Sequence, residues 1–210
     1  MNALDEQSLG GNVKWHGLIG VAPLVFGATL FLSAVLLFVV QPMVAKILLP
    51  LLGGVPAVWN AALVFFQAML LAGYLYAHVT TRWMTPRAQA VLHLALLLGI
   101  FAVLPVALPA GWLPPANDNP IPWLVLALFV TVGAPFFVVA ASAPLLQRGF
   151  TQSGHPRAHD PYFLYSPSNF GGLIALLAYP TVIEPQLRLV GQGTAWTLGF
   201  SALVILTGGC

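Results

Sequence analysis

Charged residues are scarce in this sequence: 7 Lys or Arg and 5 Asp or Glu stand among 210 residues, which is 6% of the chain. Soluble domains carry roughly a quarter of their residues as charges. So few charges cannot coat a globule of this size in water, since 59% of the residues are hydrophobic and the mean hydropathy is +0.91. The deficit excludes an ordinary soluble domain and predicts an integral membrane protein.

Cysteine is almost missing. The one cysteine, Cys210, excludes a disulfide framework within the chain, and no Cys/His cluster has the spacing of a zinc site. The net charge of +2 is small and scattered, which excludes a nucleic-acid surface. We therefore expect no metal, no cofactor and no nucleic-acid partner.

Long charge-free runs fill the rest of the chain. After Lys14 they cover residues 15–45, 47–81, 88–117, 119–147, 161–183 and 189–210. Each exceeds the ~20 apolar residues that cross a bilayer as a helix. Trimming at prolines and polar clusters predicts helices near 22–40, 57–81, 88–108, 122–146, 163–181 and 190–208. The expected fold class is an all-α integral membrane protein with about six transmembrane helices in one bundle.

The expected organisation is a polar cytoplasmic tail at residues 1–20 and one membrane domain at residues 21–210. The tail lacks the short apolar core and cleavage site of a signal peptide. Loop charges give the orientation, because cytoplasmic loops are enriched in Lys and Arg. If the amino terminus is inside, five basic residues lie on that side and two, Lys46 and Arg188, on the other. Both termini are then cytoplasmic.

Several separated motifs stand out along the chain: Gln41-Pro42, the run Lys46 to Pro50, Gly53-Gly54 followed by Pro56 to Trp59, Tyr74 to His78, Ser168-Asn169, Tyr179-Pro180 and Glu184-Pro185. Together they resemble a known family, the membrane region of bacterial fused spermidine synthase-like proteins. The resemblance covers about residues 26–200. It implies a multi-pass protein of the bacterial cytoplasmic (inner) membrane.

Family members of this kind also carry a soluble synthase-like domain with a methyltransferase-like fold, and these 210 residues lack it. A nucleotide site there needs a strand, a Gly-rich turn and an acidic residue. Neither Gly53-Gly54 nor Gly171-Gly172 follows a soluble strand. Spermidine synthesis by this chain is therefore not expected.

The segment from Gln41 to Pro50 contains the first candidate site. Pro42 removes a backbone donor, so we expect a kink or break followed by a short re-entrant or interfacial segment. Lys46 has two interpretations: it snorkels to the headgroups, or it is a paired cation that marks a polar pocket.

A polar stripe on the second predicted helix is the next candidate. Asn60, Gln67 and Tyr74 recur every seven residues, and His78 follows four residues later. They share one face, and amides in hydrocarbon need partners, so we expect this face to point into the bundle. Hydrogen bonding between helices and a substrate pathway both remain open.

The entrance to the fifth predicted helix carries Ser168, Asn169, Gly171 and Gly172. The paired glycines predict close packing against another helix. Upstream, His155 and His159 are separated by Pro156, which breaks the helix that a metal pair would need.

An acid and a base stand at matching depth near the outer ends of the first and fifth predicted helices. An unpaired charge near hydrocarbon costs a few kcal/mol, so pairing is favourable. We expect Lys46 to contact Glu184 directly or through Gln41 or water, with Arg188 as the competing partner.

No catalytic set emerges, because the few acids are scattered over loops on opposite sides. The leading hypothesis is a non-catalytic accessory or scaffold subunit of a larger membrane complex, with the lipid bilayer and other membrane subunits as partners. One alternative is a transporter or binding module for polyamines or other amines that uses the pocket residues Gln41, Lys46, Asn60, Gln67, Tyr74 and Glu184. Another is the membrane module of a split methyltransferase-like enzyme.

Overall fold

The computed structural model describes residues 3–115 and 119–210, and side chains from residue 21 onward except that of residue 49. The described part is helical, without strands. Its helices are α1 (Ala3–Leu52), α2 (Pro56–Trp83), α3 (Pro86–Gly99), α4 (Pro120–Leu128), α5 (Ala134–Thr151), α6 (Tyr165–Ala178), α7 (Glu184–Gln186) and α8 (Leu189–Gly208). Five short segments complete them: 3-10 turns at Ile100–Val103, Pro156–His159 and Pro161–Leu164, and π-helical turns at Phe129–Gly133 and Tyr179–Ile183.

Within the described residues, five helices are long and apolar enough to cross a membrane. They cover Val21–Leu52, Pro56–Trp83, Pro86–Val103, Pro120–Thr151 and Leu189–Gly208. The fourth joins α4 and α5 through a π-helical turn. The all-helical fold expected from the sequence is therefore confirmed, and five of the six expected segments form helices long and apolar enough to cross a membrane.

The expectation for the first helix is wrong at both ends. Helix α1 starts at Ala3, within the expected tail, and runs through Pro42 without a break as far as Leu52. Neighbouring side chains stabilise the turn before Pro42: Gln41 Nε2 donates to the oxygen of Leu37, and Trp196 Nε1 of α8 donates to the oxygen of Leu36. The carbonyl that loses its helical donor at Pro42 is that of Phe38, four residues earlier, and the helix nevertheless continues, so no re-entrant segment forms.

Two other boundaries differ from the expectation. The third helix ends at Val103 and not at residue 108. Leu104 precedes Pro105, and the helical conformation is disfavoured for a residue that precedes a proline. The fifth predicted helix divides into α6, a π-helical turn and α7. Pro180 lies in that turn and Pro185 in α7.

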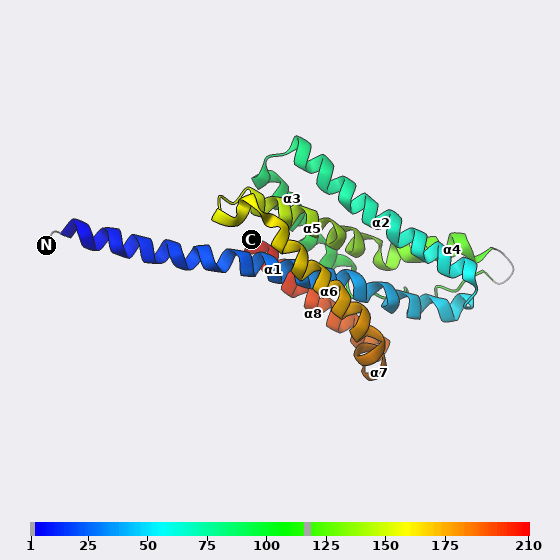
Figure 1. Ribbon diagram of the computed structural model, residues 1–210. Coiled ribbons are helices and arrows are strands. Elements are labelled where there is room, and N and C mark those ends of the chain that lie inside the picture. Colours follow the sequence, from blue (N-terminus) through cyan, green and yellow to red (C-terminus); the bar gives the residue numbers. More distant parts are fainter. Residues whose placement is uncertain (1–2, 116–118) are drawn as a thin grey trace.

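Helix α1 is the centre of the bundle. It packs along α6, α8 and α5, while α2 packs mainly on α5 and α4. The amino-terminal part of α1 projects beyond the other helices (Figure 1). The main core gathers apolar residues of α1, α2, α5 and α8, among them Met43, Phe66, Phe136 and Phe200. This arrangement brings the end of α1 beside α7, although more than a hundred residues separate them in the chain.

Candidate functional site

An ion pair joins α1 to α7. Figure 1 shows α7 toward the end of the bundle that is distant from the amino terminus. Lys46 Nζ lies 2.9 Å from Glu184 Oε1, so the contact expected from the sequence is present. The two side chains keep 37% and 44% of their surface exposed. Exposed ion pairs contribute at most about 1 kcal/mol to the stability of a protein, so this pair holds the two helices together only weakly. Because both side chains are partly exposed, their charges remain accessible to another binding partner.

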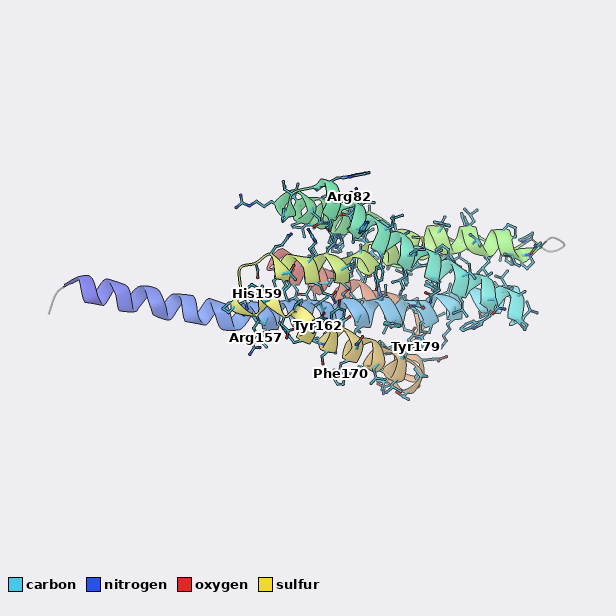
Figure 2. The ribbon with its side chains drawn as sticks, turned by 45° about the horizontal axis from the view of Figure 1, so that its top comes forward. Arg82, Arg157, His159, Tyr162, Phe170 and Tyr179 are labelled. Atoms are coloured by element: carbon cyan, nitrogen blue, oxygen red, sulfur yellow. The ribbon has the colours of Figure 1, made fainter. Side chains whose placement is uncertain are left out.

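A cavity of about 570 Å³ begins at this ion pair and lies between α1, α2 and the end of α6. Gln41 and Trp59 line it, as does Tyr179. Figure 2 shows Tyr179 toward the end of α6 that is distant from Arg157 and His159. Three of the expected pocket residues, Gln41, Lys46 and Glu184, are therefore brought together, and most of the remaining lining is apolar or aromatic.

The expected inward orientation of the polar stripe on α2 is wrong. Asn60, Gln67, Tyr74 and His78 are exposed. The buried face carries small and aromatic residues: Val58, Ala62, Phe65, Phe66, Gly73, Ala77 and Thr80. A Cβ at Gly73 would lie 3.0 Å from the oxygen of Phe137, so close approach to α5 selects the small-residue face and turns the amides outward.

The glycines at the start of α6 lie against α1. A Cβ at Gly171 would stand 2.5 Å from the oxygen of Phe31, and one at Gly172 would stand 2.9 Å from the ring of Phe38. Ser168 and Asn169 line a separate hollow of about 420 Å³ over α1, α2 and α5. These residues therefore belong to the packing of α6 on α1 and to the surface beside it.

A buried hydrogen-bond chain fixes α8 to the end of α6. Tyr179 Oη donates to Gln192 Oε1 at 3.0 Å, and Gln192 Nε2 donates to the oxygen of Leu187 at 2.9 Å. Sequence reasoning missed Gln192. Its signal was an amide inside the apolar run 189–208, since a buried amide needs partners.

A second buried polar cluster joins α3 to its neighbours. His93 Nε2 lies 3.0 Å from Ser142 Oγ, which itself donates to the oxygen of Val138. Gln89 Nε2 donates to the hydroxyls of Thr80 and Thr81 on α2. Ser142 has no exposed surface and its proton is engaged, so this histidine and serine connect helices and are not arranged as a base and an accessible nucleophile.

In the described ranges, no group of three or more His, Cys, Asp or Glu side chains is placed to hold a metal ion. The arrangement around Lys46 and Glu184 offers one ammonium and one carboxylate beside an apolar cavity, which suits the binding of a polar, charged group with an apolar part.

Comparisons with protein-family models, with curated proteins and with solved structures found no match to this chain.

Proposed function

We propose that this protein is a non-catalytic integral membrane subunit that assembles with a partner membrane protein through the outer face of α2. One observation carries the proposal. Six exposed residues form a regular line along α2 with spacings of four and three residues: Asn60, Val64, Gln67, Leu71, Tyr74 and His78.

This spacing is the heptad pattern of a helix seam. Alternation of three and four residues keeps side chains on one stripe that faces a partner helix in a left-handed pair, the commonest packing of transmembrane helices. Val64 and Leu71 are 68% and 69% exposed, so the stripe is uncovered in the part of the chain that the structure describes. We infer that a helix of another subunit covers it.

The polar members of this α2 seam favour protein over lipid as the covering partner. The amides of Asn60 and Gln67 have no hydrogen-bonding groups to meet in hydrocarbon, whereas a facing helix can supply donors and acceptors. Interhelical bonds of this kind contribute roughly 0.6 to 2 kcal/mol each. A polar residue at a regular seam position also sets the register of a pair, which suits a specific partner.

The proposal includes six crossings and cytoplasmic termini in a bacterial inner membrane. Tyr165–Gln186, the stretch from α6 to α7, has 22 residues and would be the sixth crossing: at 1.5 Å per residue it is about 33 Å long, enough for the hydrocarbon core. The bias of basic loop residues supports the orientation. The resemblance to the membrane region of spermidine synthase-like proteins agrees with this architecture, and a relationship to that region is part of the proposal.

Transport of amines is less well supported by the geometry. Asn60 and Gln67 lie outside the cavity that Gln41, Lys46 and Glu184 line. Among the described residues that line this cavity, Glu184 supplies the single carboxylate, and it is already paired with Lys46. A substrate with cationic groups alone would have to displace this ammonium and would leave Lys46 without an anionic partner.

The test is purification of the tagged protein in mild detergent, followed by quantitative mass spectrometry of co-purified membrane proteins. We expect one partner to be enriched with the wild type and to be lost with the double variant Asn60→Leu/Gln67→Leu. The control Thr194→Val removes an exposed hydroxyl from α8, outside the α2 seam, and should retain the partner.

Three results would contradict the proposal. One is the absence of any partner above an untagged control. Another is equal retention by the seam variant and the control. The third is a dimer of this chain alone in native mass spectrometry that depends on Asn60 and Gln67, because the seam would then pair two copies.

A further inference from the structure

The ion pair of Lys46 and Glu184 stands at the junction of two hollows. One is the cavity between α1, α2 and α6, and the other is an open hollow of about 540 Å³ that Arg188 also lines. Both hollows are lined by Lys46 and Glu184. A molecule at this junction would therefore meet two cations and one carboxylate.

A second hollow, beside Ser168, lies further along α1 and away from the charges. The linings of the two hollows share Phe38 and Leu176, so the pair follows α1 from Lys46 to Ser33 and is called the groove below. Thirteen residues of helix correspond to about 20 Å, which exceeds the ~15 Å of one leaflet of the hydrocarbon core. Leu173 and Leu176 at the side of the groove are each 53% exposed, so it opens laterally toward the bilayer.

We propose that this groove binds one phospholipid with a primary-amine headgroup, phosphatidylethanolamine. The acyl chain lies along α1 beside Phe38. The phosphate lies at Lys46 and Arg188, and the headgroup ammonium at Glu184.

Charge complementarity selects this headgroup. A phosphate next to Lys46 and Arg188 gains two cationic partners, and a primary ammonium offers three N–H donors to the carboxylate of Glu184. A quaternary choline has no N–H to donate. The glycerol headgroup of phosphatidylglycerol is uncharged. It brings no cation to the carboxylate of Glu184, which is then repelled by the lipid phosphate. The site therefore favours phosphatidylethanolamine over phosphatidylcholine and phosphatidylglycerol of the same acyl chains.

The experiment is native mass spectrometry of the delipidated protein, titrated separately with these three lipids. We expect one bound phosphatidylethanolamine, with an affinity about fivefold above that of the other two, which is the range of a partly exposed charge contact. Glu184→Gln should abolish this preference. Lys46→Met should weaken the binding of phosphatidylethanolamine and of phosphatidylcholine by a similar factor, because both lipids carry the phosphate.

Asp160→Asn is the matched control, since it neutralises an exposed acid outside the groove and should keep the preference. Glycerophosphoethanolamine, which has the headgroup but no acyl chains, should compete poorly. Equal affinity of the wild type for all three lipids would overturn the proposal, as would stronger binding of phosphatidylglycerol. Effective competition by glycerophosphoethanolamine would show that the groove is not used. The wild-type measurements decide these points even if a variant fails to fold.

Discussion

Gly171 of α6 lies so near to Phe31 of α1 that a Cβ at this glycine would stand 2.5 Å from the carbonyl oxygen of Phe31. Side-chain carbons do not approach a backbone oxygen so closely, and backbone cannot move aside as a flexible side chain can. This contact between the two helices therefore depends on the absence of a side chain at residue 171. This relationship makes the packing of α6 on α1 open to a direct test.

Gly171→Ala should lower the thermal stability of the protein in detergent. The added methyl forces the two helices apart, and overpacking of this kind costs typically 1–3 kcal/mol. Gly99→Ala is the control, because a Cβ at Gly99 meets nothing within 4 Å and alanine is the better helix former. Melting curves of both variants test the contact, and equal melting temperatures for the two would contradict it.

Lys46→Met should lower the melting temperature by a small amount, because it leaves the carboxylate of Glu184 without its partner at 2.9 Å. Adding Glu184→Gln should restore part of the loss, since the stranded charge is then removed. The coupling in this double-mutant cycle should be below about 1 kcal/mol, given that both side chains are partly exposed. Strict additivity of the two changes would indicate that Lys46 snorkels independently of Glu184.

Reporter fusions should place position 20 inside, position 115 outside and Cys210 inside. The five-to-two bias of basic residues and the proposed six crossings lead to this pattern. The measurement is the activity of paired reporters, one active in the cytoplasm and one active outside it. An external reporter at Cys210 would mean that Tyr165–Gln186 does not cross the membrane, leaving the five helices that are long and apolar enough by themselves.

Alkylation of Cys210 should need a higher pH than alkylation of a thiol in a short peptide. Burial raises the pKa of the Cys210 thiol, and a hydrogen-bonding contact of 3.4 Å with Thr29 Oγ1 offsets part of that rise. A raised pKa leaves less thiolate at any given pH, and the thiolate is the reacting form. The rate of iodoacetamide labelling, followed as a function of pH, should therefore have its midpoint above that of the peptide. A midpoint at or below the peptide value would contradict the packing of this thiol beside Thr29.

The sequence by itself determined the all-helical fold class and five helices long and apolar enough to cross a membrane. The scarcity of charge and the length of the apolar runs predict such helices, because a helix satisfies its own backbone groups in hydrocarbon. It also indicated the contact between Lys46 and Glu184, because isolated charges at matching depth gain free energy by pairing. These inferences depend on composition and on the position of a residue along its helix. Both can be read from the linear sequence without knowledge of how the helices pack.

Only the tertiary structure decided which face of each helix is buried. Lipid and the protein interior are both apolar, so hydrophobicity does not separate the two faces of α2. The close approach of α2 to α5 at Gly73 does distinguish the two faces, and it turns Asn60 and Gln67 outward. The groove beside Phe38 likewise arises from helices distant in sequence. Helix packing in a membrane follows shape more than polarity, and shape complementarity becomes visible only when the helices are assembled.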